Sequence, residues 1–369
     1  MATGLIPSLV PQGAHPSRAL TSRSPLSRYL SAALLLVLGL LCVPTLVATP
    51  IAGQRGFERQ DLQLTYQFTP PAWALSDPTQ STAATSASSD ASTPRPQTLH
   101  LPLWKTTTVG PYHPWAPRSA QQRLLTTLIQ QAGQQWPGVR FYVTPNTDSV
   151  RFVASDPAQQ PDVAKWLLDT RQQLLQSLLQ QSYLQRGQDA WGNAGILPDY
   201  ARIIEETSSE IGDTAEAMLQ AAGGEQTPPR QRMAWLLAFV QSIPWAALSS
   251  DDGSRGSGFL LPREVLAQNR GDCDSKATLL AALWRYLQPE IPTRIVLMPG
   301  HAALAVGLPA APGEETVTDN NVAWLLLEPT GPALMAPGHL GDHSRLYIHS
   351  GRYRLLPTQP TETNSTPSK

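Results

Sequence analysis

Hydrophobic residues along the chain follow three kinds of pattern. Residues 29–49 are almost all apolar, residues 61–68 alternate between polar and apolar, and residues 273–287 repeat apolar positions at helical spacing. About 20 apolar residues in a row suit a membrane-spanning helix. Strict alternation is typical of a half-buried strand, and spacings of three and four predict a helix with a buried face. The chain is therefore predicted to contain a membrane segment followed by folded α+β regions.

The N-terminal segment predicts how the chain crosses the membrane. Residues 1–28 contain arginines and no acidic residue, and basic residues favour the cytoplasmic side. We expect residues 1–28 to be a cytoplasmic tail and residues 29–49 an uncleaved signal anchor. A cleaved signal peptide is the alternative, but the apolar run is long for one and no clean cleavage site follows it. The prediction is a single-pass inner-membrane protein of bacterial type, with its C-terminal domains in the periplasm.

Residues 50–98 are expected to hold one strand and a linker. The alternating segment at 61–68 is the strand, and residues 76–98 are rich in Ser, Thr, Ala and Pro. A segment of that composition buries too little apolar surface to fold.

Residues 99–190 are predicted to form a small α+β domain. Apolar spacing indicates a helix near 124–132, a hairpin made by 139–143 and 150–153, and a long helix over 162–185. The long helix has one amphipathic face, which we expect to pack on the hairpin. This domain is expected to bind or position a partner, because it has no cysteine and no cluster of acids.

Residues 199–357 are predicted to form the main domain. We expect a connector over 191–198, helices over 203–219 and 233–241, and a late hairpin around 349–352, followed by a disordered tail at 358–369. With 369 residues and 41% hydrophobic content the chain can hold two folded domains. The formal net charge of -1 gives no reason to expect nucleic-acid binding.

One cysteine carries the candidate chemistry. The chain has two cysteines, and Cys42 lies in the apolar segment, so Cys273 is the single thiol of the predicted exported part. Asp272 is a good N-cap, which places Cys273 in the first turn of a helix. The helix dipole there favours the thiolate, whereas Asp272 and Asp274 oppose it by charge repulsion. A base is therefore needed to remove the proton of the Cys273 thiol.

His301 and Glu328 are the candidate partners of this thiol. His301 follows a Pro-Gly turn and begins an alternating run, and Glu328 ends an apolar strand just before a proline. A thiol, an imidazole and an acid on a helix and two strands match the arrangement of an activated nucleophile.

Several segments together resemble the transglutaminase-like superfamily, a branch of papain-like cysteine enzymes. They are Gly271–Ala277, Pro299–Ala302 and Trp324–Thr330, with 239–245 and 259–266 upstream. The resemblance covers about residues 200 to 357 and implies a papain-like core, with Cys273 as nucleophile, His301 as base and Glu328 as the residue that orients the base. The family more often has Asp in the third role, for which Asp319 and Asp342 are the alternatives.

Two further site questions arise from the sequence. Gln241 is a possible oxyanion donor by resemblance, although the backbone N–H of Cys273 is the simpler donor. The glycine-rich loop 249–258 lacks the ligand spacing of an EF-hand, and the histidines near the C-terminus lack zinc spacing; they are His339, His343 and His349. We expect no metal and no cofactor.

The expected function is an envelope cysteine enzyme. The resemblance implies a thiol peptidase that acts on amide bonds of proteins or peptides in the cell envelope. The same residues would also serve an acyltransferase that crosslinks amines, and such domains also occur as inactive scaffolds that bind a partner. The sequence leaves these alternatives open.

Overall fold

The computed structural model describes residues 3–5, 53–61, 63–76, 94–103, 117–144, 149–248 and 258–359. The predicted anchor over 29–49, most of the predicted tail and linker segments and the loop 249–257 lie outside these ranges. Within them, no helix combines the length and the apolar character needed to cross a membrane.

The largest sheet is antiparallel and has five strands in the order β11-β12-β10-β9-β13. The strands are β9 (Thr293–Met298), β10 (His301–Val306), β11 (Thr316–Asp319), β12 (Val322–Leu327) and β13 (Arg354–Pro357). Its central hairpin pairs His301 with Met298, and Leu304 pairs with Leu327 of β12 on the other side. Alternate residues of β10 face opposite cores: Ala302 and Leu304 belong to one hydrophobic cluster and Ala303 to another.

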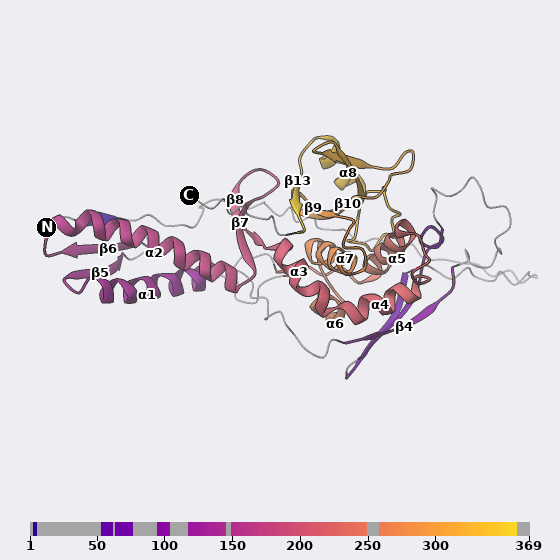
Figure 1. Ribbon diagram of the computed structural model, residues 1–369, viewed down its shortest axis with the longest axis horizontal. Helices are drawn as coiled ribbons and strands as arrows, with labels where there is room; N and C mark the ends of the chain where they lie inside the picture. The colour runs from indigo at the N-terminus through magenta and orange to yellow at the C-terminus, as the bar shows by residue number, and fades with distance from the viewer. Residues whose placement is uncertain are drawn as a thin grey trace, which may run out of the picture. The chain divides into compact units, whose positions relative to one another are not determined.

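Helix α7 (Cys273–Leu287) lies at the centre of the larger hydrophobic cluster. Every residue from Ser275 to Trp284 is buried. The helix contacts strands β9 and β10 and four other helices, α3 (Tyr200–Glu210), α4 (Gly212–Ala221), α5 (Pro229–Ser242) and α6 (Pro262–Gln268) (Figure 1). Because neighbours surround it, α7 is apolar on nearly all sides rather than on one face.

A second sheet belongs to the same core. It contains β2 (Gly53–Gln60), β3 (Gln63–Thr69) and β4 (Gln97–Pro102) in the order β2-β3-β4. The predicted alternating strand is confirmed as β3, whose Tyr66 and Phe68 are buried and meet Phe239 of α5 edge to face. The hydroxyl of Tyr66 donates to the carbonyl oxygen of Leu266 at 2.7 Å. Residues upstream of 103 therefore help to build the core that holds α7.

A smaller core forms between α1 (Pro117–Gln135), α2 (Gln160–Gln181) and the hairpin of β5 (Val139–Thr144) and β6 (Ser149–Ala154), as predicted. Figure 1 shows the two helices running side by side next to this hairpin. A short strand, β1 (Thr3–Leu5), pairs with the free edge of β6. The buried residues of α2 in this core are Val163 and Leu167, while Leu175 and Leu179 join the larger core.

Several element predictions are wrong. Residues 50–98 hold two strands, β2 and β3, and the start of β4 instead of one strand, and the long helix predicted over 162–185 ends at Gln181. The predicted connector is half of a hairpin, β7 (Leu184–Gln188) and β8 (Ala194–Pro198), because Asp189 accepts hydrogen bonds from the backbone N–H of Trp191 and Asn193 and closes a turn. The single helix predicted over 203–219 is two helices, α3 and α4, that meet at Ile211. Instead of a hairpin around 349–352, the chain forms helix α8 (Asp342–His349) and then β13. The α+β class itself is confirmed.

Candidate active site

Cys273 is the first residue of α7, as the sequence predicts. The carboxylate of Asp272 caps the helix by accepting from the N–H of Ser275 at 3.2 Å. Just upstream, the backbone of Gly271 pairs with the segment around Trp245: its N–H donates to Pro244 and its carbonyl accepts from Ala246. Residues 275–284 of the helix are buried, but Cys273 is partly exposed. The sulfur thus lies at the positive end of the helix dipole and within reach of solvent.

The turn before β10 fixes the position of His301. Gly300 has a φ of 69°, so the Pro-Gly pair reverses the chain and places His301 opposite Met298. Extending the pairing of Leu304 with Leu327 by one residue places Glu328 opposite Ala303. His301 and Glu328 are then diagonal neighbours on one face of the sheet, because residues two apart on a strand point the same way.

The imidazole of His301 links the thiol to the acid. Its Nε2 is 2.8 Å from Oε1 of Glu328, and the neighbouring side chain of Cys273 acts to raise its pKa. Since Nε2 faces the acid, the nitrogen left for the thiol is Nδ1. Burial opposes a charge on this imidazole, yet the interactions with Cys273 and Glu328 raise the pKa of His301 to about 10. The arrangement favours an imidazolium beside the carboxylate of Glu328.

Glu328 is held through both carboxylate oxygens. While Oε1 faces His301, Oε2 accepts a hydrogen bond from the hydroxyl of Ser344 in α8 at 2.6 Å. Burial acts to raise the pKa of Glu328, but the hydrogen bonds from His301 and Ser344 outweigh it and the pKa is lowered. The acid is therefore an oriented carboxylate, which is what a group that orients a histidine requires.

The two aspartates beside the thiol repel it less than the sequence suggests. Burial first, and then the charge of Asp272, raise the pKa of Asp274 well above its ordinary value, and the two carboxyl groups share a hydrogen bond. Tyr200 also donates to Asp274 at 3.2 Å. Because the pair keeps a proton at a pH where isolated aspartates are ionised, it carries closer to one negative charge than two.

Lys276 joins three backbone segments beneath the site. Its side chain is fully buried, and Nζ donates to the carbonyl oxygens of Ile243 at 2.7 Å, Gln241 at 3.3 Å and Thr330. Three acceptors match the three N–H groups of an ammonium, although burial lowers the pKa of Lys276 to about 7. The end of α5 and the loop after Glu328 are thereby fixed to the helix that carries the nucleophile.

Gln241 has a structural role in this arrangement. Its side chain is fully buried, and Nε2 donates to the carbonyl oxygens of Glu328 at 2.8 Å and Met335 at 2.9 Å. Its Oε1 accepts from the N–H of Met335 at 3.1 Å. Both amide hydrogens are used, so none is left for an oxyanion. The backbone N–H of Cys273 remains the donor for that charge.

The alternative acids do not contact His301. Asp342 is fully exposed and pairs with Arg345, and Asp319 lies at the end of β11, a strand that is not adjacent to β10. The three late histidines have separate neighbours: His339 faces the carbonyl of Pro337, His349 pairs with Glu315, and His343 packs on Tyr347. In the described ranges no group of three or more His, Cys, Asp or Glu side chains is arranged to hold a metal ion.

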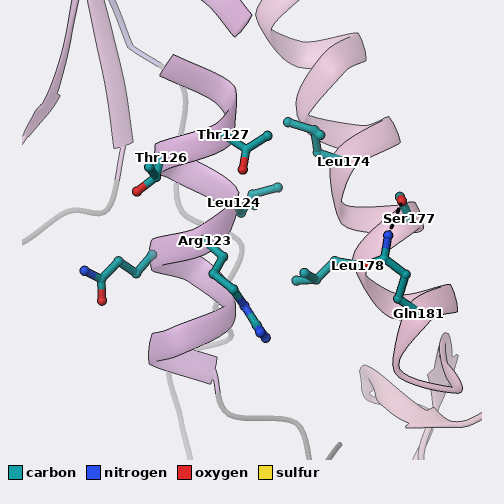
Figure 2. Close-up of a pocket in the computed structure, with 9 residues that line it drawn as sticks. Arg123, Leu124, Thr126, Thr127, Leu174, Ser177, Leu178 and Gln181 are labelled. Atoms are coloured by element: carbon teal, nitrogen blue, oxygen red, sulfur yellow. Dashed lines mark hydrogen bonds between the residues drawn. The ribbon is translucent and has the colours of Figure 1, made fainter. Parts of the chain in front are cut away.

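A hollow of the surface lies between two helices, away from these residues. A groove of about 490 Å³ runs between α1 and α2, and Figure 2 shows Leu174 and Leu178 facing Leu124 across it. Gln181 donates to Ser177 on one wall, and Arg123 is the single ionisable residue that lines it. A groove of this kind suits binding rather than covalent chemistry.

No family model, curated protein or solved structure matches this chain. The assignment of chemistry to Cys273, His301 and Glu328 therefore rests on their geometry and electrostatics.

Sequence reasoning missed the supporting residues of the site. Ser344 lies in a segment predicted as neither helix nor site, and no periodicity signals its hydroxyl. Lys276 carried a weak signal, because a lysine among the apolar positions of a helix must find acceptors when buried. Gln241 was singled out, but for a different role.

Proposed function

We propose that this protein is a thiol peptidase with a papain-like, transglutaminase-like core, acting on amide bonds of proteins or peptides. The observation that carries the proposal is the imidazole of His301, whose Nε2 lies 2.8 Å from Oε1 of Glu328 and whose pKa is raised by the neighbouring, partly exposed residue Cys273. A nucleophile, a base and an orienting acid in contact are the requirement for covalent catalysis by cysteine.

The reaction follows from the positions of these groups. With its raised pKa, His301 holds the proton that the Cys273 thiol gives up, and the sulfur attacks the amide carbonyl carbon to form a C–S bond. The backbone N–H of Cys273, at the start of α7, donates to the oxyanion. The imidazolium of His301 then protonates the leaving nitrogen as the C–N bond breaks. Water attacks the thioester, releases the acid and restores the thiol.

The layout of the elements supports a papain-like core. The nucleophile begins a buried helix, and the base and acid lie on two neighbouring strands of an antiparallel sheet that this helix contacts. If an amine rather than water accepts the acyl group, the same site makes a crosslink. An inactive scaffold is the competing proposal, against which the partial exposure of Cys273 argues, because a structural cysteine is normally buried.

The pH dependence of Cys273 alkylation by iodoacetamide tests the proposal. We expect the full-length protein in detergent to react well below the ordinary thiol pKa of ~8.5, and His301→Ala to lose that advantage. Alkylation that is slow and identical in both proteins would overturn the peptidase and favour the scaffold. Protein and peptide libraries, incubated with and without an added primary amine, then separate hydrolysis from crosslinking by the mass of the product.

The proposed location is the inner membrane of a cell envelope, with the anchor at 29–49. In a chain inserted in this way β1 and β6 would lie on opposite sides of the bilayer, so the pairing of these strands and the anchor exclude each other. Protease accessibility of spheroplasts distinguishes the two. Digestion of residues 53–359 from the outer side supports the anchor, and full protection of them rules it out.

A further inference from the structure

Ser344 reaches the site from helix α8, which lies between β12 and β13 along the chain. It lies in the first turn of α8, is 3% exposed, and its hydroxyl donates to Oε2 of Glu328 at 2.6 Å. A serine in a helix ordinarily hydrogen-bonds to a nearby carbonyl or to water. Here the hydroxyl is directed at a carboxylate, sixteen residues away along the chain.

The sheet places Glu328 on the side that α8 covers. Trp324 and Leu326 of β12 belong to the hydrophobic cluster that includes Ile348 of α8. Glu328 comes two residues after Leu326, so its side chain lies on the same face of the sheet. It therefore extends toward α8 as well as toward His301. The packing of α8 therefore brings Ser344 to the carboxylate.

The length of the glutamate side chain gives this contact its importance. A glutamate has one more rotatable bond than an aspartate, and a carboxylate held at one oxygen can rotate away from the histidine. Ser344 holds the second oxygen and so limits that rotation. A hydrogen bond to the ionised form also keeps the carboxylate charged.

We propose that Ser344 is a positioning residue, which holds one carboxylate oxygen of Glu328 so that the other oxygen faces His301. A catalytic role of Ser344 rests on the proposed function. The orientation of Glu328 by Ser344 does not depend on that function. Ser344 itself does not touch the reacting atoms.

The first test compares Ser344→Ala with Ser208→Ala in the full-length protein. Ser208 is a matched control, a buried serine of α3 that donates to the carbonyl of Glu205. NMR titration of His301, assigned with a His301→Gln variant, should show its pKa fall by at least ~0.5 unit in Ser344→Ala and stay unchanged in Ser208→Ala. Alkylation of Cys273 at pH 6 should slow ~5-fold or more in Ser344→Ala alone. Titration and alkylation like those of the parent protein would overturn the proposal.

A second test measures coupling between Ser344 and Glu328. Glu328→Asp shortens the acid by one methylene, so the carboxylate can no longer reach both partners. In that background Ser344→Ala should change the alkylation rate less than ~2-fold, since the contact it removes is already lost. Additive effects of the two substitutions would contradict the proposed link. If the parent protein shows no His301-dependent alkylation at low pH, the peptidase proposal fails, while the His301 titration still tests the role of Ser344.

Discussion

Gln241 donates from its side chain to the backbone carbonyl of Glu328 at 2.8 Å, so the end of α5 is tied to the residue whose carboxylate contacts His301. The same amide exchanges two hydrogen bonds with the backbone of Met335. One side chain therefore fixes the start and the middle of the loop between β12 and α8. The loop, in turn, determines where the carboxylate of Glu328 lies.

Replacing Gln241 by methionine should destabilise the fold. Three buried backbone groups lose their partner, so we expect the free energy of unfolding to drop by ~3 kcal/mol in urea denaturation. Gln231→Met is the matched control, because Gln231 makes a single bond, to the carbonyl of Leu75, and should cost ~1 kcal/mol. Unchanged stability together with a large loss of peptidase turnover would instead assign Gln241 to the oxyanion.

Two buried groups should give opposite pH dependences of stability. The pKa of His301 is raised to about 10 by its partners against the effect of burial, so its stabilising contribution is complete below pH ~6.5 and is lost as pH rises toward 10. Burial lowers the pKa of Lys276 to about 7, so its charge destabilises the fold at low pH and this penalty disappears as pH rises from 7 toward ~10.4.

The two contributions should nearly cancel between pH 7 and 10. We expect the parent protein to show a nearly flat stability curve there. His301→Gln should become more stable as pH rises, and Lys276→Met less stable, each by up to ~1.4 kcal/mol per pH unit. Urea denaturation at pH 7, 8 and 9 measures the three slopes. If stability changes with pH at the same slope in all three proteins, the charges assigned to His301 and Lys276 are contradicted.

Asp274→Asn should leave the thiol almost as reactive as before. The raised pKa of Asp274 comes from burial and then from the charge of Asp272, and an amide can replace the protonated acid as donor to that carboxylate. The expected change in alkylation rate at pH 7 is within ~3-fold. An increase of ~10-fold or more would mean that Asp274 is ionised and repels the thiolate.

Gly331→Ala should destabilise the fold far more than Gly300→Ala. Both glycines have positive φ, 64° and 69°, but a Cβ on Gly331 would lie 2.1 Å from the carbonyl oxygen of Gln241, whereas nothing lies within 4 Å of one on Gly300. For Gly300→Ala we expect the free energy of unfolding to fall by ~1 kcal/mol, from backbone conformation alone. Gly331→Ala should exceed this by at least ~2 kcal/mol. Equal thermal shifts in the two variants would show that the loop moves away freely.

The sequence predicted the residues whose positions follow from local pattern. A capped helix places Cys273, a Pro-Gly turn places His301, and a strand that ends before proline places Glu328. The order of these elements along the chain then limits the ways in which the three side chains can come into contact. The contacts of Lys276 and Ser344 escaped prediction, because each joins segments whose proximity depends on how α5, α8 and the sheet pack. Hydrophobic spacing describes which face of an element is buried, and it carries no information about which polar atoms meet across a core.

The burial of α7 on all sides also determines how the site responds to stress. Ten consecutive residues of this helix, Ser275 to Trp284, are buried among four helices and two strands. Fluctuations that open a loop or fray a terminus leave such a helix intact, so its amides exchange with solvent mainly through cooperative unfolding. Cys273 is the first residue of this helix, which we expect to exchange among the slowest of the described elements. Heat or denaturant should therefore abolish the activated thiol in one step, together with the fold itself.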